Sequence, residues 1–149
     1  MELEQRSTRT IEMIREIVSE ICGVSLNDLR RRSGTRKSVE ARQIMMYMLR
    51  KFMHMSYKEI LRHFDARNHT TVMYSLQTIE GISSYDKRVA KLMSMIESDI
   101  DKAIRKKEAQ LKLSYFTIFD GVSARGIYNT EQSAMMNLEP GERILSIYT

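Results

Sequence analysis

The run Arg67-Asn68-His69-Thr70-Thr71-Val72 combines side chains that are suited to contact a nucleic acid. Asn, His and Thr offer short hydrogen-bond donors and acceptors, and no carboxylate follows them until Glu80. Asn68 is a favoured N-cap residue, and apolar periodicity begins at Val72. The run therefore predicts the start of a helix whose polar tip can contact base edges or phosphates.

Two predicted elements position this tip. The apolar spacing continues from Val72 through Leu76 to Ile79, and the helix is expected to end near Gly81. Just before it, Ser56-Tyr57-Lys58-Glu59 has the pattern of a capping box, which predicts a short helix followed by a turn at 65–68. A short helix, a tight turn and a longer helix form a helix-turn-helix, whose second helix enters the DNA major groove.

Positive charge is concentrated in one segment upstream of this motif. The chain has 149 residues and a net charge of +5, and residues 21–54 hold eight Arg or Lys against two acids. Within that segment, the run Arg30-Arg31-Arg32-Ser33-Gly34-Thr35-Arg36-Lys37 lacks periodicity and is predicted to be a basic loop. Ser38 is predicted to cap the next helix, which would run to about Met53. Charge alone would also fit a solvated loop.

The remaining segments complete a mainly helical prediction. Helices are expected at 10–22 and 84–107, with a single helical turn that begins near Ser25 and has Leu26 and Leu29 inward. Beyond Ala109 the pattern changes, with strand-like runs at 111–119 and at 144–148, after a Pro140-Gly141 turn. We therefore expect a helical DNA-binding domain over 1–109 with its helix-turn-helix at about 56–82. Residues 110–149 would form a small β-rich extension.

Several classes of function are disfavoured by the sequence. Cys22 is the only cysteine, so no internal disulfide is expected, and we expect it to be a small core residue rather than a nucleophile. We expect no membrane segment, no signal peptide and no metal site, since His54 and His63 lack partners at ligand spacing. The nearest approach to a nucleotide-binding Walker A motif starts at Gly121 and lacks its lysine. A cytoplasmic, nucleoid-associated protein that is not an enzyme and uses no cofactor is the expectation.

Three motifs together resemble a known family. They are Val39-x-x-Arg42-Gln43-Ile44, Ser56-x-x-Glu59-Ile60 and Phe64-x-x-Arg67-Asn68-His69-Thr70-Thr71-Val72. With their spacings, they make residues 10–104 similar to the C-terminal DNA-binding domain (domain IV) of DnaA, the bacterial chromosomal replication initiator. The resemblance implies a helical bundle with a helix-turn-helix, of the Trp repressor-like kind, that binds short duplex sites.

The resemblance also assigns roles to individual residues. Asn68, His69, Thr70 and Thr71 fall on positions that read bases in the major groove, and Arg36 falls on an arginine that enters the neighbouring minor groove. The other residues expected to contact DNA lie around these two groups: Lys37, Arg42 and Gln43 by the basic loop, Tyr57 and Lys58 at the start of the motif, and Arg67 before the recognition helix.

This sequence departs from the family pattern at three positions. The family has Asp where this chain has Asn68, and two glycines where it has Asp65 and Ala66. A carboxylate can accept a hydrogen bond from the cytosine amino group, whereas an amide can pair bidentately with adenine. We therefore expect the DNA target to differ from that of the family.

The expected function is sequence-specific binding of double-stranded DNA in replication initiation or its regulation, with no nucleotide. A single domain of this kind makes few contacts, so a second copy or a protein partner is expected to assist through residues 110–149. Two alternatives remain: a transcriptional regulator or competitor for initiator sites with the same fold, and a protein-interaction adaptor with a degenerate DNA-binding fold.

Overall fold

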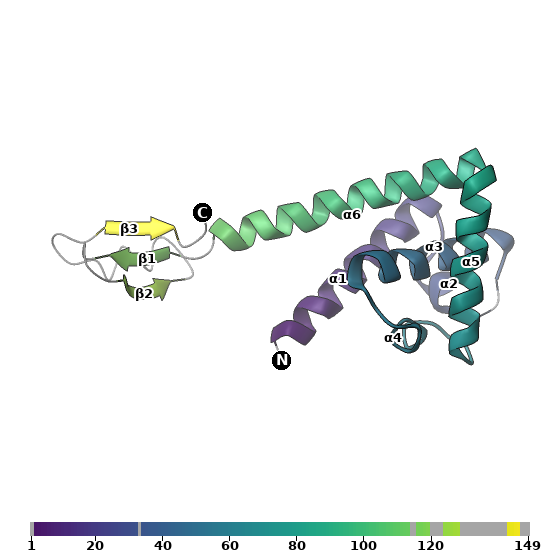
Figure 1. The fold of residues 1–149 in the computed structure, drawn as a ribbon, viewed down its shortest axis with the longest axis horizontal. Coiled ribbons are helices and arrows are strands. Elements are labelled where there is room, and N and C mark those ends of the chain that lie inside the picture. The colour runs from purple at the N-terminus through teal and green to yellow at the C-terminus, as the bar shows by residue number, and fades with distance from the viewer. Residues whose placement is uncertain (1, 33, 114–115, 120–123, 129–142, 147–149) are drawn as a thin grey trace. The chain divides into compact units, whose positions relative to one another are not determined.

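The structure, a computed structural model, is mainly helical (Figure 1). It describes residues 2–32, 34–113, 116–119, 124–128 and 143–146, with side chains described for 4–32 and 34–110. By its internal contacts the chain divides into unit 1, Met1–Ile100, and unit 2, Asp101–Thr149. Among the described residues, no helix is both long enough and apolar enough to cross a membrane. The helices in these ranges are α1 (Glu2–Cys22), α2 (Leu26–Arg30), α3 (Arg36–Met53), α4 (Tyr57–Leu61), α5 (His69–Tyr85) and α6 (Lys87–Leu113).

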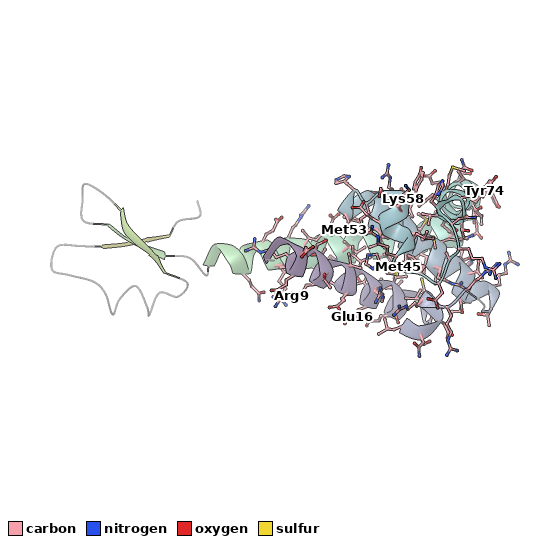
Figure 2. The ribbon with its side chains drawn as sticks, turned by 90° about the horizontal axis from the view of Figure 1, so that it is seen from below. Arg9, Glu16, Met45, Met53, Lys58 and Tyr74 are labelled. Carbon is pink, nitrogen blue, oxygen red and sulfur yellow. The ribbon has the colours of Figure 1, made fainter. Side chains whose placement is uncertain are left out.

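Helix α3 forms the centre of unit 1, where it contacts α1, α2, α4 and α5. Full burial of one such apolar side chain contributes roughly 1.5–3 kcal/mol, so this core fixes the helices around α3 firmly. Ala41, Met45, Met48 and Leu49 of α3 are buried, and Met45 is labelled in Figure 2. Ile44 and Met46 are buried as well, because α3 has neighbours on more than one side.

The other helices each bury an apolar stripe. Helix α5 buries the expected stripe of Val72, Leu76 and Ile79. Helix α1 buries Ile14 and Val18. Helix α6 buries Val89, Met93, Ile96 and Ile100. In α2, Leu29 is buried as expected, but the prediction for Leu26 is wrong because this side chain is 47% exposed. A helix of five residues has room for only one inward position here.

Helix α1 is longer than its apolar pattern predicted. It begins at Glu2 rather than near Thr10, and its added residues are polar and exposed over 4–9. Glu, Gln and Arg favour helix on their own, so the helix extends past the residues that pack on the core.

Helix α5 also continues beyond its expected end, because Gly81 lies within it and the helix runs on to Tyr85. The stop is instead at Asp86, whose carboxylate accepts hydrogen bonds from the backbone N–H groups of Arg88, at 2.9 Å, and Val89, at 3.3 Å. These bonds satisfy the first turn of the next helix, so α6 begins at Lys87 rather than near Ser84.

Helix α3 begins earlier than expected, at Arg36, because Thr35 and not Ser38 is its cap. The Thr35 hydroxyl accepts a hydrogen bond from the Ser38 backbone N–H at 3.2 Å, while the Ser38 side chain is itself buried. Arg36 and Lys37, which were expected in the basic loop, therefore lie in the first turn of α3.

Unit 2 contains the end of α6 and the short strands β1 (Phe116–Phe119), β2 (Ala124–Tyr128) and β3 (Arg143–Ser146). The strands pair antiparallel in the order β2-β1-β3, with Thr117 opposite Ile127 on one side and Leu145 on the other. The strand expected over 111–119 is wrong in its first part, because α6 continues to Leu113. The expected Pro140-Gly141 turn and the end of the second strand-like run lie outside the described residues.

Candidate nucleic-acid interface

Helices α4 and α5 form the predicted helix-turn-helix. The Ser56 hydroxyl accepts from the Glu59 N–H at 3.3 Å, and the Glu59 carboxylate accepts from the Ser56 N–H at 2.7 Å, which completes the predicted capping box. Hydrogen bonding of this carboxylate, first with the Ser56 side chain and then with the Ser56 backbone, lowers the pKa of Glu59 below its ordinary value. Ile60 and Phe64 are buried and hold α4 and the turn against the rest of the domain.

Asn68 is the N-cap of α5, as its residue type predicted. The Thr71 backbone N–H donates to Asn68 Oδ1 at 3.2 Å, and the Thr71 hydroxyl donates to the same oxygen at 3.3 Å. The amide oxygen of Asn68 therefore faces into the helix and receives two hydrogen bonds. The orientation of the amide follows from these donors, because only an oxygen can accept from a backbone N–H.

The polar tip of α5 faces outward. Asn68, His69 and Thr71 are exposed, Thr70 is half-buried, and Tyr74, one turn further on, is 61% exposed. In Figure 2 the labelled Tyr74 lies on α5 and Lys58 on α4. The expected major-groove residues are thus gathered at one accessible end of one helix.

The start of α4 lies close to the end of α3. Tyr57 is half-buried and Lys58 is exposed, and the guanidinium of Arg50 lies 5.3 Å from the centre of the Tyr57 ring. Arg50 also donates to the Met55 carbonyl at 2.6 Å, across the bend at which His54 takes a left-handed conformation with φ of 51°. A cation over an aromatic ring is attractive, so Arg50 fixes the ring of Tyr57 and with it the beginning of the motif.

The basic segment stays exposed although its boundaries differ from the expected loop. Arg31 and Arg32 follow α2, Gly34 and Thr35 lead into α3, and Arg36 and Lys37 begin that helix. All six of these residues are exposed. We call Arg30, Arg31, Arg32, Arg36 and Lys37 the basic face.

One contact ties the basic face to the helix-turn-helix. The backbone N–H of Asp65, in the turn before α5, donates to the carbonyl of Arg30 at 3.0 Å. The Asp65 carboxylate lies 3.7 Å from the Arg30 side-chain nitrogen Nε. Both side chains are more than half exposed, so the ion pair itself contributes little, at most about 1 kcal/mol. The pairing nevertheless fixes the basic face beside α5, through a residue that replaces a family glycine.

The buried side chain of Arg42 holds the loop before α3 in place. Its guanidinium donates to the Arg32 carbonyl at 2.7 Å and to the Ser38 carbonyl at 3.3 Å, and the side chain is only 9% exposed. Burial lowers the pKa of Arg42, and the charge of Asp28 opposes this shift. Arg42 thus shapes the loop from inside, while its neighbour Gln43 is half-buried.

Gly34 lets the loop pass close to α3. A Cβ atom at this position would lie 3.0 Å from Ser38 Cβ and 3.3 Å from the Arg42 side-chain nitrogen Nη2. Any larger residue would therefore push the loop away from Arg42. The sequence indicated a loop here, but it gave no sign of this close approach.

A groove of about 250 Å³ lies where the basic loop, α3 and the start of α5 meet. It brings together side chains that are far apart in the sequence, and arginines supply much of its wall. The predicted contact residues Arg42, Gln43, Arg67 and Thr71 share this groove, whereas Tyr57 and Lys58 do not line it. Its other lining residues are Arg30, Arg32, Val39, Met46, Phe64, Asp65, Ala66 and Ser75.

Sequence reasoning missed three parts of this site. Arg30 and Arg32 were included only as members of a charged run, and Asp65 was noted only as a departure from the family pattern. Arg30 and Asp65 pair across 35 residues, and the Arg32 carbonyl accepts from Arg42 ten residues away, so no local pattern reports these contacts. Only the helix caps of this site could be predicted from residues that are close together in the sequence.

Taken together, a short capped helix, a tight turn and a longer helix with an exposed polar tip define a helix-turn-helix domain. Residues 11–79 match the family model described as "Bacterial dnaA protein helix-turn-helix". This part of the chain is a helix-turn-helix domain of the DnaA family, corresponding to the C-terminal domain of DnaA proteins.

The individual relatives agree with this assignment. The chain is 36% identical over 90 residues to the chromosomal replication initiator protein DnaA of Picosynechococcus, covering 60% of this chain and 20% of that protein. It is 31% identical over 102 residues to DnaA of Bdellovibrio bacteriovorus, covering 68% and 22%. A solved DNA replication initiation factor matches with a TM-score of 0.54 and 26% identity, over 67% of this chain and 32% of that one. The chain thus spans about a fifth of the length of these curated relatives.

Proposed function

We propose that this chain binds double-stranded DNA in a sequence-specific manner, in replication initiation or its regulation. The tip of α5 enters the major groove, where Asn68, His69, Thr70 and Thr71 contact base edges. The observation that carries the proposal is the groove between the basic face and the start of α5, because it joins a cationic surface to an accessible recognition helix.

The basic face supplies the attraction to phosphates that does not depend on sequence. Its five cations are exposed, and within the described residues only Arg30 among them forms an ion pair with a carboxylate. Each phosphate neutralised releases counterions, so affinity should fall with salt at a slope of about −0.9 per contact. Arg36, at the start of α3, is the residue that we assign to the neighbouring minor groove.

The buried and half-buried residues of the site position the readers. Arg42 supports the loop by its hydrogen bond to the Arg32 carbonyl, and Arg50 supports Tyr57 by lying over its ring. Lys58 and Arg67 are exposed on either side of the turn, where they can meet phosphates. Phosphate contacts of this kind set the register of α5 on the duplex.

The chain acts in this proposal without nucleotide and without catalysis. These 149 residues hold no complete Walker A motif, so we assign them no contact with a nucleotide. A domain that binds initiator-type sites without that coupling is suited to a regulatory role, as a repressor or as a competitor for such sites. Genomic footprints would separate this role from a direct one at an origin.

Selection from a random duplex pool tests the proposal most economically. The full chain, at moderate salt, should enrich one short sequence family over successive rounds. Enrichment of no sequence, together with binding no stronger than to random duplex, would overturn the proposal. That result would favour the adaptor alternative, in which the fold is kept and a protein partner is bound instead.

A further inference from the structure

The cap of α5 limits what Asn68 can offer to DNA. Its Oδ1 accepts two hydrogen bonds from Thr71, one from the backbone N–H at 3.2 Å and one from the hydroxyl at 3.3 Å. A carboxamide oxygen has two lone pairs, and both are used by these contacts. The amide nitrogen Nδ2 donates no hydrogen bond within the described residues, and Asn68 is exposed. Asn68 therefore presents N–H donors outward and keeps its acceptor inside the helix.

This arrangement argues against the bidentate pairing with adenine that residue type alone suggests. That pairing requires the amide oxygen to accept from the adenine amino group while the nitrogen donates to N7. Turning the amide to free its oxygen would remove the cap of α5 and leave the Thr71 N–H without its partner. Loss of an N-cap costs about 1 kcal/mol, which offsets much of the gain from the second hydrogen bond.

We propose that Asn68 reads DNA as a hydrogen-bond donor only and so rejects cytosine. This proposal rests on the DNA binding proposed above. In the major groove, guanine offers O6 and N7, thymine O4 and adenine N7 as acceptors, whereas cytosine offers only its amino donor. A donor directed at cytosine finds no acceptor, so the base facing Asn68 is guanine, thymine or adenine.

The same geometry predicts the effect of a carboxylate at this position. An aspartate would cap α5 with one oxygen and keep its second oxygen as an outward acceptor, because both carboxylate oxygens accept. The outward group would change from donor to acceptor while the cap remained. A single atom of residue 68 would then decide whether cytosine is rejected or accepted.

Selection from one random duplex pool with four full-length chains tests the proposal. The chains are the unchanged protein, Asn68→Asp, Asn68→Ser and Gln5→Glu. Serine is as good an N-cap as asparagine, but its hydroxyl is held at the cap and lies on a shorter side chain, so Asn68→Ser removes the outward amide nitrogen and keeps the helix. Gln5→Glu makes the same amide-to-carboxylate change at an exposed position near the start of α1, so it controls for the added negative charge.

The unchanged protein and Gln5→Glu should return the same site, with cytosine disfavoured at the position that Asn68 faces. Asn68→Asp should shift that one position toward cytosine by about five- to tenfold, and Asn68→Ser should lose the preference there. Thermal unfolding of both residue-68 variants should stay close to that of the unchanged protein, which shows that the cap persists.

Two results would overturn the proposal while leaving DNA binding intact. One is a preference of the unchanged protein for cytosine at the position altered by Asn68→Asp. The other is an identical site for all four chains. Enrichment by none of them would refute the proposed function itself and this proposal with it, so the two failures are distinguishable.

Discussion

In the proposed binding mode, single residues of this domain are of two kinds: surface residues that contact DNA bases, and residues beneath them that hold these in position. Asn68 belongs to both groups, because its oxygen caps α5 and its nitrogen faces outward. Arg42 belongs to the second group, since its guanidinium holds the Arg32 carbonyl from inside. Assigning a residue to one group determines which measurement should change when it is replaced.

Arg36 should contribute charge rather than fold. Its side chain is exposed in the first turn of α3, so Arg36→Ala should leave thermal unfolding nearly unchanged. The variant should bind DNA more weakly, and the slope of log affinity against log salt should become shallower by about 1. Fluorescence anisotropy titrations over a range of salt concentrations measure both quantities. An unchanged slope would show that Arg36 does not contact a phosphate or groove.

Cys22 should be a poorly reactive thiol. Burial, and then the charge of Glu40, raises its pKa to about 11, while Lys37 and Arg88 act in the opposite direction. Because the thiolate is the nucleophile, the native chain at pH 8 should react with an aromatic disulfide reagent about a hundredfold more slowly than the denatured chain. The native rate should rise with pH toward that pKa. Equal rates for the native and denatured chains would contradict the buried placement.

Within single elements, sequence patterns predicted those features that depend on contacts between nearby residues. The capping box of Ser56 and Glu59 and the N-cap at Asn68 were both predicted, because each needs partners only three residues away. The choice of Thr35 over Ser38 as the cap of α3 was not, since the two hydroxyl residues are close in sequence and tertiary packing buries one of them.

Longer-range contacts explain the remaining differences. The link between Asp65 and Arg30 joins segments that the sequence alone does not place side by side. The inward turn of Arg42 likewise depends on the path of the loop at Gly34. Helix ends at Glu2 and Tyr85 were misplaced because apolar periodicity reports packing, and helices extend beyond the residues that pack.

Gly81 offers a direct test of the extended α5. An added Cβ at this helical position would meet no atom within 4 Å, so Gly81→Ala should stabilise the protein by about 0.5–1 kcal/mol. Gly23 is the matched control, because its φ of +59° is strained for alanine and its Cβ would lie 3.1 Å from Lys37 Nζ. Gly23→Ala should destabilise by about 1 kcal/mol. Denaturant unfolding of both variants decides the matter, and destabilisation by Gly81→Ala would place the end of α5 before residue 81.

At the scale of the molecule, the chain divides into two parts with separate expected roles. Unit 1 contains the helix-turn-helix and the basic face, and unit 2 contains the end of α6 and the strands β1, β2 and β3. We assign DNA contact to the first and, as a proposal, self-association or partner binding to the second. Two weakly binding domains joined in a dimer bind neighbouring sites more tightly than one.

Truncation after Ala109 should separate these roles. The full chain should show a mass above the 17.5 kDa of one copy in light scattering, and the truncated chain should show the mass of a single copy. Circular dichroism should confirm that the truncated chain keeps its helices, and its binding to a single site should persist. The same oligomeric state for both chains would count against an interface in residues 110–149.

We propose that the tip of α5 recognises the DNA sequence, while the basic face supplies affinity for any DNA. The most direct test compares binding of the unchanged protein, His69→Ala and Arg36→Ala to a selected duplex and to a scrambled duplex of the same composition, at one salt concentration. His69→Ala should lose about 1–3 kcal/mol on the selected duplex and almost nothing on the scrambled one, whereas Arg36→Ala should weaken binding to both. Equal losses on the two duplexes for His69→Ala would contradict base reading by α5.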